Sequence, residues 1–316
     1  MRAVLRLLPV VVVLAVAASG CGSTSSSKPG AIDVVVTTTQ LGDIVRNVGG
    51  DAVDVHQILR PNTDPHDYEP RPKDIQATAG AKLVITSGDQ LDAWMADVIK
   101  NAGGHPTVLD AGVGRPVALP GEDTGPEASR FDPHWWHDPR NVEYAVLRIR
   151  DALARADGAA TARVDAGAEA YLAKLKTEDA AIAHCIAAVP AAQRKLVTDH
   201  DAFGYFAKHY DIDVVGAVIP SQTTQAQPSA GDLAKLTTTI KREHVKAIFP
   251  ESSINPKLAK AIARETGATA DHTLYGDTLG PAGSRGATYL AMEAANADAM
   301  VRGFTGGAQG CTVSGI

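Results

Sequence analysis

The stretch PNTDPHDYEP, residues 61–70, surrounds one histidine with carboxylates and prolines. Its three prolines prevent a helix or a central strand from running through it, and Asn62, Thr63 and Asp64 favour turns. A loop as stiff as this loses less conformational entropy when it binds an ion. His66, at its centre, is therefore a candidate metal ligand, although a single loop histidine is more often simply solvated.

Three further polar residues follow segments with the pattern of strands. His134 lies in FDPHWWHDP after the strand-like TVLDAG, His200 directly follows KLVTD, and Asp277 lies in LYGDTLG after the last predicted strand. In open α/β sheets, ligands bind beyond the carboxyl ends of the strands. Neutral imidazole and carboxylate are good ligands for first-row metals. The sequence therefore predicts one metal site, provided that the two halves of the chain face each other, with the ligands His66, His134, His200 and Asp277.

The elements that must position these residues alternate between strand and helix. Short β-branched runs occur at 32–39, 53–59 and 82–88, each followed by an amphipathic stretch, and the same alternation starts again after Pro190 with RKLVTD. Repeated βα order is typical of a parallel sheet covered by helices. We expect an α/β fold with two lobes, each a mainly parallel sheet flanked by helices.

Between the lobes, AATARVDAGAEAYLAKLKTEDAAIAHCIAAVP offers about 30 residues of helix formers without an internal proline. A helix of that length spans roughly 40 Å, which suits one long rigid helix that joins two lobes. The predicted organisation has five parts: signal peptide 1–20, lipidated tether 21–30, N-terminal lobe 31–158, linking helix 159–189 and C-terminal lobe 190–316.

The N-terminus has the pattern of a bacterial export signal, with Arg2 and Arg6 before an apolar run and small residues. ASGC is similar to a lipobox, in which Cys21 would carry the lipid; Ala18 departs from the usual Leu. We therefore expect a protein exported and anchored by lipid to the outer face of the cytoplasmic membrane. A plain cleaved signal peptide and an uncleaved anchor helix are the alternatives.

Composition and the remaining cysteines fit an exported globular protein. The chain is 45% apolar and 21% charged, and its formal net charge is −6 without a basic stripe. That balance argues against nucleic acid as a partner and makes a cation the more natural ligand. Cys185 and Cys311 form an even pair that could become a disulfide outside the cytoplasm, although their spacing does not decide it.

Four motifs occur together and in order: PNTDPHDYEPRPKD, DPHWWHDP, TDHDAFGYFAKHYDID and LYGDTLG. Over nearly the whole mature chain, this pattern resembles the substrate-binding lipoproteins of bacterial zinc and manganese ABC importers. The resemblance implies two lobes joined by one long helix, and delivery of the metal to an ABC permease with its ATPase subunit. It implies the same four ligands, His66, His134, His200 and Asp277. We expect a monomer.

The resemblance also bears on the choice of metal. Manganese-binding members tend to have Glu at the position of His200, so this chain favours Zn²⁺ over Mn²⁺, which stays the alternative. The segment 112–133 lacks the His-rich insert of many zinc-specific members and offers acids in its place, among them Glu122, Asp123 and Glu127. His137 stands where the family usually has Leu.

Several residues beside the ligands could orient them or add to them. Asp67 and Asp201 follow His66 and His200 directly and could hold the imidazoles, or could simply cap loops. Glu251, at the end of AIFPE, is a candidate for a hinge or for the same orienting role. His137 could be a spare ligand, a residue behind the ligands or a surface histidine.

Other classes of function compete with metal transport. A zinc-dependent hydrolase needs an open coordination position and a nearby base, but four protein ligands would close the site and no HExxH motif is present. A surface adhesin would keep its partner after loss of all four ligands. A binder of an unrelated small molecule would use the histidines only as polar lining. We expect a binding protein, not an enzyme.

Overall fold

The computed structural model describes residue 28 and residues 30–125 and 127–315. Within this part of the chain, no helix is both long enough and apolar enough to cross a membrane. The predicted export signal 1–20 and the lipidation of Cys21 lie outside the described residues.

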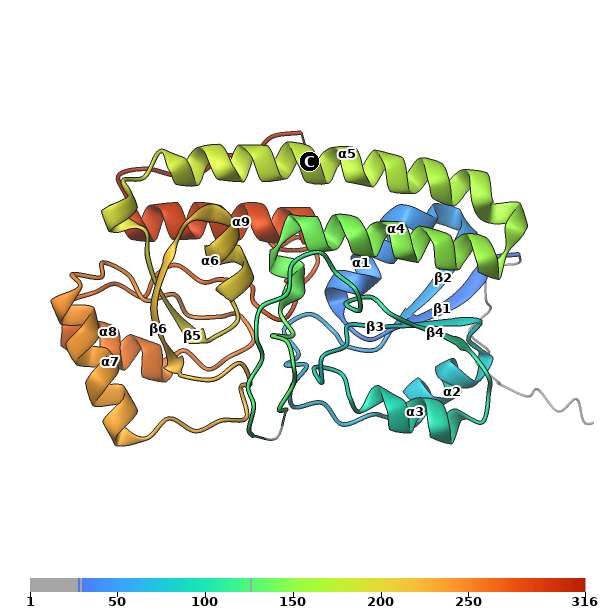
Figure 1. Cartoon of the computed structure of the whole chain (residues 1–316), viewed down its shortest axis with the longest axis horizontal. Coiled ribbons are helices and arrows are strands. Elements are labelled where there is room, and N and C mark those ends of the chain that lie inside the picture. Colours follow the sequence, from blue (N-terminus) through green and yellow to red (C-terminus); the bar gives the residue numbers. More distant parts are fainter. Residues whose placement is uncertain (1–27, 29, 126, 316) are drawn as a thin grey trace, which may run out of the picture.

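The first half of the chain builds a parallel sheet of four strands in the order β2-β1-β3-β4. One face packs against α1 and α4, and the other packs against α2 and α3 (Figure 1). The apolar residues alternate along β1, so that Val34 and Val36 enter one core and Val35 the other. The bounds are β1 Ile32–Val36, α1 Thr39–Gly49, β2 Val53–Gln57, α2 Pro72–Gly80, β3 Leu83–Thr86, α3 Met95–Ala102, β4 Thr107–Asp110 and α4 Pro139–Ala156.

The second half repeats the design around the parallel pair of β5 and β6. Two further predicted strands appear only as isolated parallel bridges, which join Phe249 to Thr198, Ala247 to Thr269 and Leu274 to Glu251. Pro250 separates the paired residues of this segment and has no N–H to donate, which helps to explain the broken ladder. The bounds are β5 Lys195–His200, α6 Gly204–Tyr210, β6 Asp213–Ile219, α7 Ala230–Arg242 and α8 Lys257–Thr266.

Helix α5 (Thr161–Ala187) runs along both halves of the molecule (Figure 1). Its 27 residues correspond to about 40 Å and lie within the predicted linking segment 159–189. Val164 and Leu175 pack into the core of the first half, whereas Ile182 and Ile186 pack into that of the second. The helix is therefore part of both cores and is not a free tether.

Helix α9 (Tyr289–Thr305) also spans the two halves, which the sequence did not indicate. Tyr289 and Met292, in its first turn, belong to the core of the first half, whereas Met300 and Phe304 belong to that of the second. Two packed helices thus connect the lobes, α5 by the chain itself and α9 by its contacts.

A disulfide joins Cys185, near the end of α5, to Cys311 in the C-terminal tail, with their Cα atoms 5.4 Å apart. This settles the pairing that the spacing of the cysteines left open. The tail is thereby fixed against the C-terminal end of α5, where Cys311 and Val313 join the second core.

Candidate metal centre

The four predicted ligands come together between the two halves of the chain. One possible ligand atom from each lies within 4.8 Å of the others, and all four side chains are buried. Asp277 lies among the imidazoles: its Oδ1 is 3.3 Å from Nε2 of His134, and its Oδ2 is 3.3 Å from Nε2 of His200 and 3.6 Å from Nε2 of His66. All three imidazoles thus turn the same nitrogen toward one carboxylate.

Each ligand lies at the end of a strand or in the connection that follows a strand or a bridge. His66 follows β2, His200 is the last residue of β5, and Asp277 comes three residues after the bridge at Leu274. His134 lies in the connection after β4 and immediately precedes a 3₁₀ turn. The carboxyl ends of both sheets therefore supply the site, as expected of open α/β folds.

A carboxylate lies within hydrogen-bonding distance of Nδ1 of each imidazole. The partners and distances are Asp132 for His134 at 2.7 Å, Glu251 for His200 at 2.9 Å and Glu127 for His66 at 2.5 Å. A carboxylate that accepts the Nδ1–H fixes the orientation of the ring and leaves the Nε2 lone pair for a metal. The site thus consists of three imidazole–carboxylate pairs around Asp277.

The tripeptide Asp-Pro-His occurs twice, at 64–66 and at 132–134, and gives the same turn both times. In each copy the aspartate Oδ1 accepts from the backbone N–H of the histidine, at 2.9 Å. In the second copy the same Oδ1 also holds the histidine ring. This repeat could have identified Asp132 as an orienting residue, which the sequence analysis missed.

Of the residues predicted to orient the ligands, Glu251 contacts an imidazole, whereas other acids hold the rings next to Asp67 and Asp201. Glu251 holds the ring of His200 and also accepts from its backbone N–H at 3.0 Å, which fits the orienting role. Asp67 is exposed and Asp201 half-buried, and the acid at the adjacent imidazole is Glu127 in one case and Glu251 in the other. Of the two roles considered for Asp67 and Asp201, the orienting role is thus filled by Glu127 and Glu251 instead.

His137 is buried and is not a surface histidine. Its Nδ1 lies 2.8 Å from Glu293 of α9, and its ring stacks on Phe203 with centroids 4.5 Å apart. The group of four possible ligands does not include it. It links the connection that carries His134 to the bridging helix.

Trp136 closes one side of the site. Its ring lies edge-on to that of His134, with centroids 5.4 Å apart, and its Nε1 donates to the carbonyl of Gly276 at 3.1 Å. Both Trp135 and Trp136 are buried. Trp136 therefore excludes water from His134 and fixes the turn that carries Asp277.

The charges in the cluster depend on one another. Burial alone would lower the pKa of His134, but the carboxylates of Asp132 and Asp277 raise it to about 9. Burial likewise opposes protonation of His200, whose pKa Glu251 and Asp277 raise well above its ordinary value. Burial would raise the pKa of Asp277, but the neighbouring imidazoles of His200 and His134 hold it well below its ordinary range. An incoming cation must therefore displace protons from imidazoles that are charged at neutral pH.

The donor atoms fit a first-row divalent cation. Both oxygens of Asp277 and Nε2 of His66 are buried without a hydrogen-bond partner among the described residues. Leaving buried polar atoms unpaired is costly, and a cation among them would satisfy all three. Three imidazole nitrogens and a carboxylate form a chemically suitable set for Zn²⁺ and related metals.

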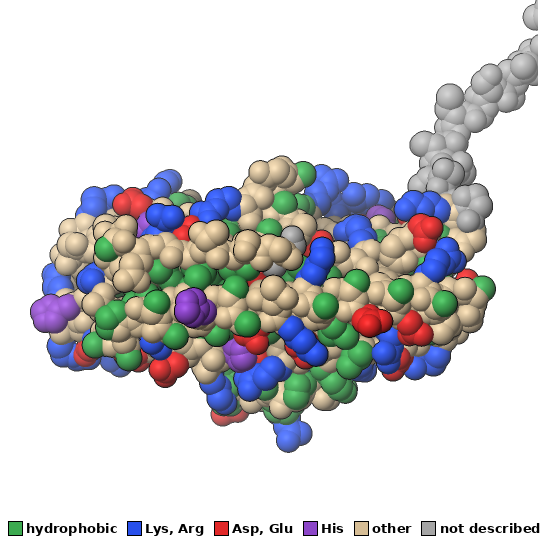
Figure 2. Space-filling model, turned by 90° about the horizontal axis from the view of Figure 1, so that it is seen from above, with side chains coloured by type: hydrophobic (Ala, Val, Ile, Leu, Met, Phe, Trp, Pro, Cys, Tyr) green, Lys and Arg blue, Asp and Glu red, His purple; other side chains and the backbone are tan. Residues whose placement is uncertain are grey.

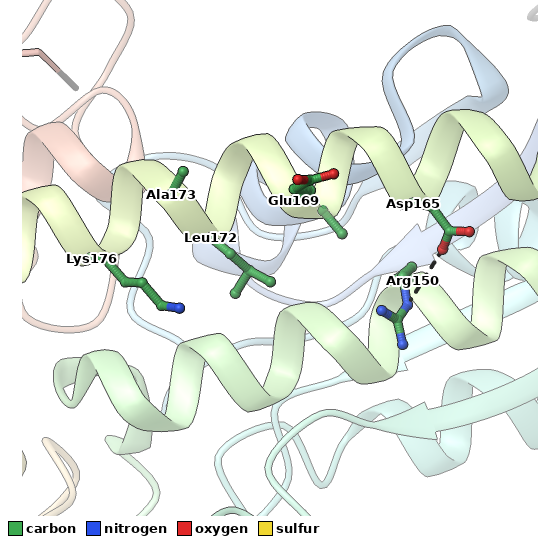
Figure 3. Close-up of a pocket in the computed structure, with 7 residues that line it drawn as sticks. Arg150, Asp165, Glu169, Leu172, Ala173 and Lys176 are labelled. Carbon is green, nitrogen blue, oxygen red and sulfur yellow. Dashed lines mark ion pairs between the residues drawn. The ribbon is translucent and has the colours of Figure 1, made fainter.

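The outer surface carries mixed charges and a shallow hollow between α4 and α5. Seen from above, on the side of α5, it carries basic and acidic side chains interspersed (Figure 2). A hollow of about 520 Å³ lies between α4 and α5, where Arg150 and Asp165 form an ion pair of 3.6 Å (Figure 3). None of the four possible ligands lines it, so this hollow is separate from the metal centre.

Comparison with known proteins decides the family. Residues 34–303 match the family model described as zinc-uptake complex component A, periplasmic. The chain belongs to this family. The family's members are substrate-binding components of uptake systems, so this protein binds metal outside the cytoplasm as part of an import complex and is not an enzyme.

Individual members of the family are similar over most of the chain. The manganese-binding lipoprotein MntA of Halalkalibacterium halodurans is 30% identical over 94% of this chain and 97% of its own length. The iron-binding protein YfeA of Yersinia pestis is 32% identical over 86% of each chain. The structure of the periplasmic zinc-binding protein TroA of Treponema pallidum superposes with a TM-score of 0.80 at 30% identity, over 87% of this chain and 99% of that one. The two-lobed α/β fold and the family resemblance are thus confirmed, whereas these family members are named for three different metals.

Proposed function

We propose that this protein captures Zn²⁺ in the cleft between its lobes, through His66, His134, His200 and Asp277, and delivers it to an ABC permease. The observation that carries the proposal is the convergence of four buried donor side chains from both halves of the chain within 4.8 Å. Ligands from two lobes can bind one ion only when the lobes are together, so binding and closure are coupled.

The donor set supports zinc as the preferred metal. Zn²⁺ is commonly four-coordinate with nitrogen and carboxylate ligands, whereas Mn²⁺ favours more oxygen ligands and binds a given site more weakly. Here three of the four donors are imidazoles, and each is held by a carboxylate that increases its basicity. Manganese remains the second candidate, because the relative MntA is named for it.

The export signal, Cys21 and the tether support a lipid anchor at the outer face of the membrane. Relatives that cover nearly the same length are named as lipoproteins of metal ABC transporters. A random-coil tether of ten residues would hold the two lobes within roughly 17–19 Å of the anchor. The partners we propose are a permease and its ATPase subunit, and we propose that the protein acts as a monomer. A role as a surface adhesin remains the untested alternative to metal delivery.

Release requires a small movement and not a wide hinge opening. Helices α5 and α9 pack into both cores, so a large rotation between the lobes would expose apolar surface at two places. We propose that the permease separates the two ligands of the first half from the two of the second, which leaves the ion with an incomplete set of donors.

The test is a titration of protein stripped of metal. Calorimetry with Zn²⁺ and Mn²⁺ in a weakly coordinating buffer should give one bound ion per chain and a lower Kd for Zn²⁺. A lower Kd for Mn²⁺ would replace zinc by manganese in the proposal. Absence of saturable binding by either metal would refute the proposed site.

A further inference from the structure

The three acids that hold the imidazoles differ in how firmly they are built into the fold. The side chains of Asp132 and Glu251 are 3% and 0% exposed, whereas that of Glu127 is 15% exposed. Glu127 lies on the long connection between β4 and α4, 61 residues from the histidine that it contacts. The orientation of His66 thus depends on a surface loop, unlike that of the other two imidazoles.

The two Asp-Pro-His turns explain why His66 needs a partner from elsewhere. In the second turn, Asp132 accepts both from the backbone and from the ring of its histidine. In the first turn, Asp64 accepts from the backbone of His66, while its Oδ2 accepts from the hydroxyl of Thr224 at 2.6 Å. The ring of His66 turns instead to Glu127, which therefore does for His66 what Asp132 does for His134.

The loop that carries Glu127 rests on the second half of the molecule. Glu122 accepts from the hydroxyl of Ser221 at 2.9 Å and from the backbone N–H of Gln222 at 3.0 Å. The loop is closed at its base by the antiparallel bridge between Pro120 and Phe131. Glu127 thus lies on a connection of the first half that Glu122 joins to the second half.

From this arrangement we infer that Glu127 is a positioning residue for His66, so that retention of the metal depends on the contact between these two side chains. When this contact is lost, Nδ1 of His66 has no other carboxylate partner among the described residues, whereas Nδ1 of His134 and Nδ1 of His200 keep theirs. His66 is then the first ligand to release the ion. The inference rests on the proposed metal site and adds to it the residue that controls one ligand.

The experiment compares Glu127→Ala and Glu127→Gln with Glu122→Ala, which lies on the same loop but contacts no imidazole. Zinc affinity is measured by competition with a chromophoric chelator, and release is measured by stopped flow into excess chelator. Loss of an outer carboxylate partner typically weakens metal binding 10–100-fold. We expect a loss in that range for Glu127→Ala, mainly through faster release, and a smaller loss for Glu127→Gln, whose amide oxygen still accepts a hydrogen bond.

Two readouts separate positioning from general loosening. In ¹⁵N-edited NMR of the metal-free protein, the His66 Nδ1–H signal should disappear in Glu127→Ala and persist in Glu122→Ala. Because Glu122→Ala keeps the carboxylate at His66, its rate of zinc release should stay close to that of the wild type. Equal acceleration of release in Glu122→Ala and Glu127→Ala, or a Glu127→Ala affinity within twofold of wild type, would overturn the inference. If the wild type bound no zinc, the proposed function would fail instead, whereas the NMR comparison would still test the contact.

Discussion

Asp277 and the three imidazoles form a network in which every charge is set by its neighbours. The carboxylate faces Nε2 of all three rings, and each ring has a second acid behind it. Without a metal, protons on the imidazoles balance the buried acids. The ion therefore enters by exchange with protons, which makes binding depend on pH.

The first prediction is that zinc affinity rises with pH up to about pH 9. The raised pKa of His134, about 9, and that of His200, also raised, mean that both rings carry an extra proton at neutral pH. Each proton that the ion displaces lowers the apparent affinity by up to about tenfold for every pH unit below the pKa. Calorimetry at pH 6, 7 and 8, in buffers of different ionisation enthalpy, should show release of at least one proton. An affinity that does not change over this range would contradict the assignment.

The second prediction concerns the loss of one ligand. His66→Ala should weaken zinc binding by more than the 10–100-fold typical of outer partners, because it removes a donor atom itself. The fold should persist, since His66 lies in a loop and belongs to neither sheet. The matched control is His105→Ala, at an exposed histidine of the same half, which should bind as the wild type does. Equal affinities for the two variants would exclude His66 from the site.

At the residue scale, the sequence indicated the four converging side chains but few of their partners. Prolines and strand ends identified His66, His134 and His200 because both features are local in the chain. The acids behind two of these rings lie 61 and 51 residues away. Only Asp132 shares a motif with its histidine, and no local pattern connects Glu127 to His66.

At the scale of the elements, two acids are buried at the contact between α5 and α9. Glu178 of α5 and Glu293 of α9 are both buried. Burial, and secondarily the charge of Glu293, raises the pKa of Glu178 to about 10. One oxygen of each carboxyl has no hydrogen-bond partner within the described part of the chain. The helix contact therefore holds a neutral, protonated Glu178 at physiological pH.

The third prediction is that Glu178→Gln stabilises the protein, increasingly so as the pH rises. Between the unfolded pKa, about 4.3, and the folded pKa of about 10, the folded state holds a proton that the unfolded state has released. The free energy of unfolding of the wild type therefore falls with pH in this window, by at most about 1.4 kcal/mol per unit. Glutamine resembles the protonated acid and has no such loss.

Thermal unfolding at pH 6 and pH 8 provides the measurement, with Glu169→Gln on the exposed side of α5 as the control. The Tm advantage of Glu178→Gln over wild type should be larger at pH 8, and the control should show none. A lower Tm for Glu178→Gln at pH 8 would mean that the carboxylate is ionised and paired in the folded protein.

The elements themselves were predictable to different degrees. The long helix was evident, because an uninterrupted run of helix formers is a local property. The last strands of the second half were less so: residues 247–251 have the composition of a strand, yet Pro250 and the short pairing leave only bridges. The residues of a helix do not show locally which lobe the helix packs against. The sequence analysis therefore gave no sign that the first turn of α9 lies in the core of the first half.

At the scale of the whole molecule, α5 and α9 limit how far the lobes can separate, whereas the disulfide lies within the core of the second half. The disulfide fixes the tail to α5 between positions that are 126 residues apart. In the chain-entropy model, a cross-link between such distant positions stabilises the protein mainly because it lowers the conformational entropy of the unfolded chain. Its effect should therefore be on stability and not on the metal site.

The fourth prediction is that the double variant Cys185→Ser with Cys311→Ser loses about 2–5 kcal/mol of stability while its zinc Kd stays within about twofold of wild type. Denaturant unfolding and chelator competition measure the two quantities. A large loss of affinity in a folded variant would show instead that the tail influences the cleft.

The central claim is that both halves of the chain hold one divalent ion. Crystals of the zinc-loaded protein, measured on both sides of the zinc absorption edge, test it most directly. We predict a single anomalous peak per chain at about 2.0–2.2 Å from one atom of each of the four side chains: His66, His134, His200 and Asp277. A well-occupied zinc peak bonded to other residues, with these four side chains unbound, would contradict the account.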